Sequence, residues 1–252
     1  MLEVKGITAI FGGVTALSAV SFGVEQGEFL GLIGPNGAGK TTVLNAISRL
    51  STLADGDIEF EGASLLPMRP HEIIRRGIVR TYQNMALCPT MSVLANVMLG
   101  GLWRRPSSAF AEWLGTPAAR QRSTEVERDA IEAMRAVGIV DAALARVDSL
   151  AHGMRRKVEL ARALCAHPRL ILLDEPASGL SDQEAEELVA LIRRFRSSLG
   201  LTMIVIEHHM DVVMALSDRI VVLDGGRVIA EGIPSAVAAN PAVLEAYLGQ
   251  PA

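Results

Sequence analysis

The chain has 252 residues, half of them hydrophobic, and a formal net charge of −4. This length suits one α/β domain with a small inserted lobe, and the acidic balance gives no basic footprint for nucleic acid. Mean hydropathy is high at +0.31, yet no apolar run approaches the ~18–20 residues that a membrane-spanning helix needs. The composition therefore favours a large buried sheet with some apolar surface left for a partner.

The hydrophobic pattern predicts an alternation of strands and helices. Residues 1–33 read as short strands, with turns at 12–13 and 26–28. Apolar residues at helical spacing mark the stretch 92–146, within which we expect 103–123 to be irregular because it gathers prolines, serines and both tryptophans. The other elements expected, in chain order, are a helix at 41–50, a strand at 58–60, a helical turn at 70–76, a strand at 78–82, a helix at 153–166, a strand at 170–174, a helix at 182–198, a strand at 202–206, a helix at 210–216 and a hairpin of strands 219–223 and 227–231.

The segment 34–42 carries the clearest chemistry, since it satisfies G-x-x-x-x-G-K-[ST] between an apolar strand and a helix. Glycines let the main chain curl so that N–H groups point at phosphate oxygens, and the helix adds the positive end of its dipole. We expect Lys40 to neutralise phosphate charge and the Thr41 hydroxyl to ligate Mg²⁺. The residues predicted to bind a nucleoside triphosphate are Gly34, Pro35, Asn36, Gly37, Ala38, Gly39, Lys40, Thr41 and Thr42.

A pair of acids follows the apolar run Leu170 to Leu173, which suits a central strand buried on both faces. Asp174 falls at the carboxyl end of that strand, where ligands bind in open α/β sheets, and it can hold the same Mg²⁺ as Thr41. Glu175 comes next and can polarise or deprotonate a water for attack on the γ-phosphate. The alternative is a strand that ends in a solvated acidic turn.

The ordered set of motifs resembles the ATP-binding subunit of an ABC transporter over essentially the whole chain. Finer features are similar to the ATPases of branched-chain (hydrophobic) amino-acid importers, and relatives that handle urea, amides or other small polar solutes share much of the pattern. The motifs are the phosphate loop, Gln83, Leu-Ala-His-Gly-Met at 150–154, Leu-Asp-Glu-Pro at 173–176 and Glu-His at 207–208; the finer features are Phe-Gly-Gly at 11–13, the segment 80–84, the insertion near Trp103 and the ending at 240–249.

The resemblance implies a P-loop NTPase (RecA-like) core with an N-terminal antiparallel β region and an inserted α-helical subdomain. Residues 1–90 and 156–252 would form the core, and about 91–155 the helical subdomain. It also implies that Phe11 stacks on adenine, that Gln83 reaches Mg²⁺ and the attacking water, and that His208 hydrogen-bonds the γ-phosphate. For Phe11 the alternative is an aromatic packed in the core; for Gln83 and His208 it is a solvated or structural side chain.

The signature segment departs from the usual Leu-Ser-Gly-Gly-Gln. In the signature segment, residues 150–154, only Leu150 and Gly153 match, and Ala151 lacks the serine hydroxyl that would reach the ATP of the opposite chain. With these three residues, His152 is also expected to contact that ATP. A hydrogen bond to a charged group is worth roughly 1.5–3 kcal/mol, so we expect a weakened contact. Ser181 likewise replaces a frequent Asp, and the charge run at 155–157 is expected to be a solvated helix face.

The function implied is hydrolysis of Mg-ATP to power an importer, most consistent with branched-chain amino acids. The partners implied are a second ATPase subunit, alike or related, two transmembrane permease subunits and, indirectly, an extracytoplasmic solute-binding protein. The chain would lie peripherally on the cytoplasmic face of the inner membrane. A soluble ABC ATPase acting on ribosomes or DNA is the alternative, although such proteins carry tandem cassettes or a long coiled coil.

Overall fold

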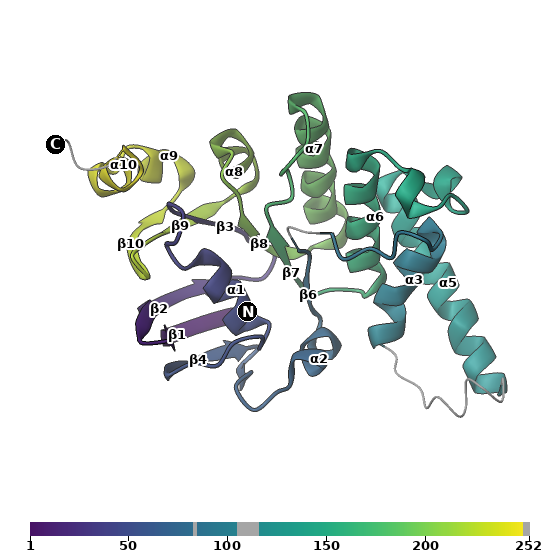
Figure 1. Ribbon diagram of the computed structural model, residues 1–252, viewed down its shortest axis with the longest axis horizontal. Helices are drawn as coiled ribbons and strands as arrows, with labels where there is room; N and C mark the ends of the chain where they lie inside the picture. Colours follow the sequence, from purple (N-terminus) through teal and green to yellow (C-terminus); the bar gives the residue numbers. More distant parts are fainter. Residues whose placement is uncertain (83–84, 105–115, 249–252) are drawn as a thin grey trace. The chain divides into compact units, whose positions relative to one another are not determined.

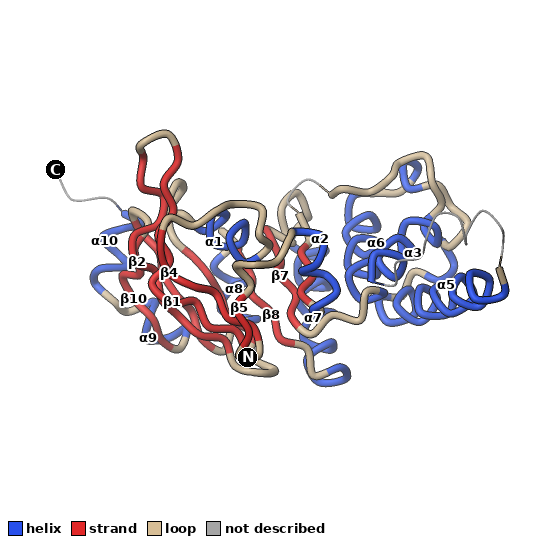
Figure 2. Tube along the Cα trace, turned by 90° about the horizontal axis from the view of Figure 1, so that it is seen from below, coloured by secondary structure: helices blue, strands red, loops and turns tan. Residues whose placement is uncertain are grey.

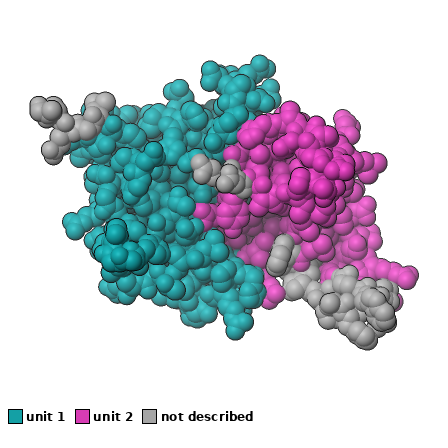
Figure 3. All heavy atoms as spheres, viewed as in Figure 1, with its two compact units in different colours: residues 1–73, 170–252 teal, residues 74–169 magenta. Residues whose placement is uncertain are grey.

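The computed structural model describes residues 1–82, 85–104 and 116–248. The chain divides into two compact units, of which the first comprises residues 1–73 and 170–252 and the second residues 74–169 (Figure 3).

Unit 1 begins with an antiparallel sheet of strand order β2-β1-β4-β5 (Figure 2). Along β1 buried and exposed side chains alternate, as expected for a strand with one face on a core. The N-terminal antiparallel region predicted from the sequence is therefore confirmed. Its strands are β1 (Leu2–Phe11), β2 (Val14–Val24), β4 (Asp55–Phe60) and β5 (Ala63–Ser64).

A second sheet runs through unit 1 in the order β10-β9-β3-β8-β7. Strands β3, β7 and β8 are buried at every residue, which explains their continuous apolar sequences. They run parallel, so the loops that follow them leave the same edge of the sheet. Its strands are β3 (Phe29–Ile33), β7 (Leu170–Asp174), β8 (Thr202–Ile206), β9 (Arg219–Asp224) and β10 (Arg227–Gly232), and the helices of the unit are α1 (Lys40–Ile47), α2 (Pro70–Ile73), α7 (Asp182–Leu199), α8 (Met210–Leu216), α9 (Pro234–Ala238) and α10 (Pro241–Leu248).

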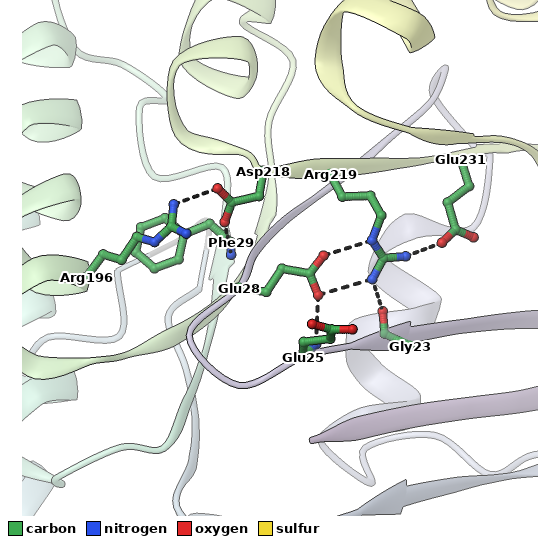
Figure 4. A network of polar contacts seen from close by, with 8 residues as sticks. All are labelled: Gly23, Glu25, Glu28, Phe29, Arg196, Asp218, Arg219 and Glu231. Atoms are coloured by element: carbon green, nitrogen blue, oxygen red, sulfur yellow. Dashed lines mark hydrogen bonds and ion pairs between the residues drawn. The ribbon is translucent and has the colours of Figure 1, made fainter.

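A polar network ties the two sheets of unit 1 together at the amino ends of β3 and β9 (Figure 4). Arg219 donates from Nε to Glu28 Oε1 over 2.8 Å and from Nη2 to the carbonyl of Gly23 in β2 over 2.7 Å. Its remaining nitrogen, Nη1, pairs with Glu231. This network lies at the end of β3 opposite to the phosphate loop, so it braces the core without taking part in the site.

Unit 2 is mainly helical, and its three longest helices, α3, α5 and α6, pack against one another (Figure 1). Among the residues described, no helix combines the length and the apolar character needed to cross a bilayer. The elements of the unit are η1 (Ile74–Arg76), β6 (Ile78–Arg80), α3 (Val93–Arg104), α5 (Pro117–Val137), η2 (Val140–Ala142), η3 (Val147–Ser149) and α6 (His152–Cys165).

Helix α5 begins earlier than the sequence suggested. Thr116 is its N-cap and accepts a hydrogen bond from the Ala119 N–H over 3.3 Å, while Pro117 occupies the first turn, where a missing N–H costs nothing. The expectation of irregular chain over 103–123 is therefore wrong for residues 103–104, which end α3, and for 117–123. Residues 105–115 lie outside the described part of the chain.

Candidate nucleotide and hydrolysis site

The loop at 34–39 joins β3 to α1, and two of its glycines cannot be replaced without a clash. Gly39 is the N-cap of α1 with φ of 101°, and a Cβ there would lie 2.8 Å from the Ala16 carbonyl oxygen. At Gly34, with φ of +149°, a Cβ would lie 2.0 Å from the carbonyl oxygen of Leu223. No side chain caps α1 and its first turn carries no acid. The helix therefore offers an uncompensated positive end to an anion.

Lys40 folds back over this loop. Its Nζ donates to the carbonyls of Gly34 and Pro35 over 2.8 and 2.9 Å, and the residue is only 7% exposed. Burial lowers the pKa of the Lys40 ammonium, and the negative charges of Glu175 and Asp174 oppose that shift. A buried cation beside curled main chain is a good fit for phosphate.

The remaining loop residues fit the same ligand. Thr41, in the first turn of α1, is exposed, so its hydroxyl is free to reach a nucleotide-bound Mg²⁺. Among the residues described, no cluster of three His, Cys, Asp or Glu is placed to hold an ion. Mg²⁺ characteristically takes one or two protein ligands and completes its shell with phosphate and water, so it fits this arrangement. Of the other predicted binding residues, Asn36 and Gly37 are exposed, Thr42 is half-buried and Ala38 is buried.

The predicted acids lie at the carboxyl end of β7, beside the end of β8. Asp174 pairs in register with Ile206 and is 6% exposed. Glu175 has a left-handed main chain with φ of 50°, and its N–H donates to the Ile206 carbonyl over 2.9 Å. Its Oε1 lies 2.9 Å from His208 Nε2, and the two side chains are 18% and 40% exposed. The structure thus brings Glu175 and His208, 33 residues apart, into direct contact at an accessible edge.

Phe11 is the last residue of β1 and is 46% exposed. The alternative of an aromatic packed in the core is therefore wrong, and an exposed ring face is what base stacking requires. The adenine contact itself stays a prediction.

Gln83 lies outside the described residues, as does Asn84, but the main chain on either side of them is held by α6. Glu159 Oε1 accepts from the Tyr82 N–H over 3.1 Å, and Arg156 Nη1 donates to the Tyr82 carbonyl over 3.3 Å. Arg162 Nη1 donates to the carbonyl of Ala86. Side chains of α6 thus hold the main chain shortly before and shortly after Gln83.

The signature segment leads into α6. Leu150 is the C-cap of η3, Ala151 is the N-cap of α6 without a side-chain hydrogen bond, and both Ala151 and His152 are exposed. Gly153, half-buried, lies in the first turn. Arg155 supports the segment from behind, since its Nε donates to the Leu150 carbonyl over 2.9 Å. The helix start is thus presented without the hydroxyl of the usual motif.

The expectation that the charge run at 155–157 is a solvated face is wrong for Arg156, while Arg155 and Lys157 are half-buried. Arg156 is 4% exposed and pairs with Glu159, 3% exposed, over 3.1 Å. Burial raises the pKa of Glu159, while the Tyr82 N–H and the Arg156 charge oppose the rise. The expectation failed because a sequence shows charge but not burial.

Ser181, which stands where the family frequently has Asp, has a local structural role. Its hydroxyl accepts from the Glu184 N–H over 3.4 Å and the Glu184 carboxylate accepts from the Ser181 N–H over 3.0 Å, which forms a capping box at the start of α7.

Sequence reasoning assigned no role to Glu207, an acid that directly follows the buried strand β8 as Glu175 directly follows β7. It is 2% exposed and lies next to His208. The signal was present, because a carboxylate directly after a fully apolar strand of a parallel sheet faces the ligand edge.

Comparisons with known proteins agree with these features. The ABC transporter family model matches residues 17–178, and the model of the branched-chain amino acid ATP-binding cassette transporter matches residues 227–252. The chain is 38% identical to the high-affinity branched-chain amino acid transport ATP-binding protein BraF of Pseudomonas aeruginosa, over 99% of this chain and 98% of BraF.

Two solved structures are similar to the chain. One is a nucleotide-free ATP-binding cassette from an ABC transporter, with a TM-score of 0.87 and 28% identity over 99% of both chains. The other is a dimeric cassette in a post-hydrolysis state bound to ADP and Pi, with a TM-score of 0.77 and 25% identity over 93% of this chain and 99% of the other. The expected P-loop NTPase core of ABC type is thereby confirmed. A matching family model over residues 17–178, together with relatives aligned end to end, places the chain in the ABC transporter family as an ATP-binding and ATP-hydrolysing subunit.

Proposed function

We propose that this chain powers the import of branched-chain or other hydrophobic amino acids. The observation that carries the proposal is the alignment with BraF over nearly the whole of both chains, and the match of residues 227–252 to the branched-chain cassette model supports it. The working assembly would hold a second ATPase subunit, two permease subunits and, across the membrane, a solute-binding protein. The chain would sit peripherally on the cytoplasmic face of the inner membrane.

For nucleotide binding, Phe11 stacks on the base while Lys40 and the main chain of the loop hold the phosphates. Thr41 and Asp174, with Gln83, are the proposed Mg²⁺ ligands, and the ion would neutralise charge on the phosphates. Lys40 now donates to two carbonyls of its own loop. It would exchange these contacts for phosphate oxygens, which compensate its buried charge better.

For hydrolysis, Glu175 accepts a proton from the attacking water and His208 hydrogen-bonds the γ-phosphate. Leu150, Ala151, His152 and Gly153 of the second chain would cover the nucleotide from the other side. ATP then favours the closed pair through its additional contacts there, and loss of the γ-phosphate removes that preference. The helical lobe at about 91–155 would carry the signature to the neighbour's nucleotide.

The first test is Glu175→Gln. The variant keeps the shape of the side chain but cannot accept a proton, so we expect ATP affinity to be retained and turnover to fall by about 10²- to 10⁴-fold. In ATP the variant should elute as a dimer in size-exclusion chromatography, and Lys40→Ala, made as the control, should bind little ATP and stay monomeric. Native rates of hydrolysis in Glu175→Gln would show that the base is assigned wrongly.

The solute is tested in the complete complex. The chain, tagged and purified from solubilised membranes, should bring down permeases, and ATP hydrolysis of the reconstituted complex should rise with leucine-loaded binding protein. Stimulation by urea or an amide instead would assign the alternative solutes. Recovery of ribosomes or DNA without permeases would exclude a transport role.

A further inference from the structure

Glu207 is a buried carboxylate whose place in hydrolysis is unassigned. It follows the last residue of β8, and its side chain is only 1% exposed. Burying a charged carboxylate is unfavourable unless several donors compensate it, so the chain has reason to keep one only where its contacts matter.

The contacts of Glu207 join two loops. Its Oε1 accepts from the Ala177 N–H over 2.7 Å, in the loop that follows β7. Its Oε2 accepts from the N–H groups of His208 and His209 over 2.9 and 3.3 Å, and lies 3.2 Å from His209 Nδ1. One oxygen therefore accepts from the loop that carries Glu175, the proposed base, and the other accepts from the loop that carries His208, the proposed γ-phosphate contact.

The two loops meet again at the accessible edge. Ala177 stands two residues after Glu175, whose Oε1 contacts His208 Nε2 over 2.9 Å. The two loops are therefore connected twice. Glu207 holds the main chain of both, at Ala177 and at His208, and the side chains of Glu175 and His208 contact each other. The left-handed main chain of Glu175, unusual for a residue with a side chain, is of the kind that persists only when its surroundings over-determine it.

We propose that Glu207 is a positioning residue for ATP hydrolysis, which fixes the separation of Glu175 and His208 through the main chain of their loops. The inference rests on the roles proposed above for those two residues. Three N–H donors face the carboxylate from its two sides, so both of its oxygens must accept. An amide has one oxygen and one NH₂ group. In either orientation of a glutamine side chain here, its NH₂ group would face a main-chain N–H that needs an acceptor.

The test is Glu207→Gln in the full chain, measured alone and in the reconstituted complex. We expect ATP affinity to stay within about twofold of the native value and kcat to fall about 10- to 100-fold, the effect typical of losing an outer-shell partner. The matched control is Glu28→Gln, which removes another largely buried carboxylate of unit 1, with 11% side-chain exposure, from the opposite end of β3 (Figure 4). The control should lose stability and keep kcat, because Glu28 contacts Arg219 and the Glu25 N–H only at that end.

Two further measurements separate positioning from general damage. Hydrogen exchange should accelerate in residues 175–181 and 207–211 of Glu207→Gln and remain native elsewhere. In a His208→Ala background the same substitution should cost less than it does alone, because residues that act through one another are not additive. Fully additive effects, or native kcat in Glu207→Gln, would overturn the inference.

Should Glu207→Gln fail to fold, Glu207→Asp decides, since it keeps the charge and withdraws the carboxylate by one methylene. A lowered kcat at unchanged ATP affinity supports positioning, and a native kcat refutes it. The outcome is separable from the proposed function. If Glu175→Gln abolishes turnover while the Glu207 variants remain active, the site stands and the positioning role falls. If Glu175→Gln hydrolyses normally, the catalytic assignment itself is wrong.

Discussion

At the scale of residues, the site holds Glu175 in a strained main-chain conformation that hydrogen bonds stabilise. The φ of 50° at Glu175 belongs to a region that costs a residue with a side chain about 1–3 kcal/mol. Two hydrogen bonds offset that cost: the Glu175 N–H donates to the Ile206 carbonyl, and the Glu175 carboxylate accepts from His208 Nε2. Held in this manner, Glu175 would meet a bound water with little reorganisation, as its proposed role of base requires.

The exposed ring of Phe11 gives a direct prediction. Phe11→Ala should raise the Kd for ATP about 5- to 150-fold, equivalent to the ~1–3 kcal/mol of one aromatic–base stack, and Phe11→Trp should retain affinity. Fluorescence titration with a labelled nucleotide measures the change. The control is Ile10→Ala, since Ile10 is 51% exposed and its side chain points to the other face of β1. Equal affinities of both alanine variants would remove Phe11 from the base site.

Sequence patterns identified the residues whose spacing is itself the signal. The phosphate loop and the acids after β7 were found because turn glycines and apolar strands dictate where neighbouring side chains go. Arg156 and Glu207 were missed, since their importance comes from burial among main-chain groups distant in sequence. A charged residue in a polar run looks the same whether water or a Tyr82 carbonyl faces it.

At the scale of elements, α6 performs two tasks. Its N-terminus carries the signature residues, and one turn further Arg156 and Glu159 hold the main chain of Tyr82. Burial lowers the pKa of the Arg162 guanidinium, and the nearby Glu159 charge opposes that shift. The helix thus carries the segment proposed to contact a second chain, and it also braces the main chain of Tyr82 within unit 2.

Removal of Arg156 tests this brace. Arg156→Met leaves Glu159 buried and unpaired, so we expect the free energy of unfolding to fall by about 3–5 kcal/mol near neutral pH. Burial already raises the pKa of Glu159, and loss of the cation raises it further. The variant is therefore penalised above that pKa and relieved as the carboxylate gains a proton, so its deficit should be largest at neutral pH and smaller at acidic pH.

Urea denaturation at both pH values measures the effect, with Arg155→Met as the control. Arg155 is half-buried and donates to two carbonyls, those of Leu150 and Asp148, so its loss should cost less and vary little with pH. A pH-independent deficit in Arg156→Met would contradict the buried-pair explanation.

Periodicity predicted most elements correctly, including the β9–β10 hairpin and helices α7 and α8. It failed at α5 because Pro117 was taken as a break. At a first turn proline supports a helix, and the Thr116 cap that decides between the two outcomes is a three-dimensional contact.

At the scale of the whole molecule, the proposed site needs a second chain, and Ala151 marks the weakest part of that contact. Ala151→Ser should raise ATP turnover at the partner's nucleotide by about tenfold, the equivalent of ~1.5 kcal/mol from a hydrogen bond to a charged group. Turnover of the assembled pair measures this, with Ala151→Val as a control that adds bulk without a hydroxyl. Equal rates for the Ser and Val variants would show that the alanine costs the assembly nothing.

The proposed pairing of chains is not visible in one sequence or in one chain's structure, because the residues proposed to make its contacts are simply exposed in the isolated chain. Ala151 and His152 are of this kind.

The position of α6 has a consequence for the proposed pair of chains, because the helix begins at the signature segment and also holds the main chain of Tyr82, one residue before the predicted Gln83. The first turn of α6 and the side chain that holds Tyr82 belong to one continuous helix. A displacement of the first turn would therefore be transmitted to Tyr82 without an intervening loop. If nucleotide bound next to one signature changed the nucleotide affinity of the other site of the pair, the second site would change the affinity of the first by the same factor, because coupling free energies between binding sites are reciprocal. Coupling through α6 would therefore make ATP binding and hydrolysis at the two proposed sites of the pair depend on each other.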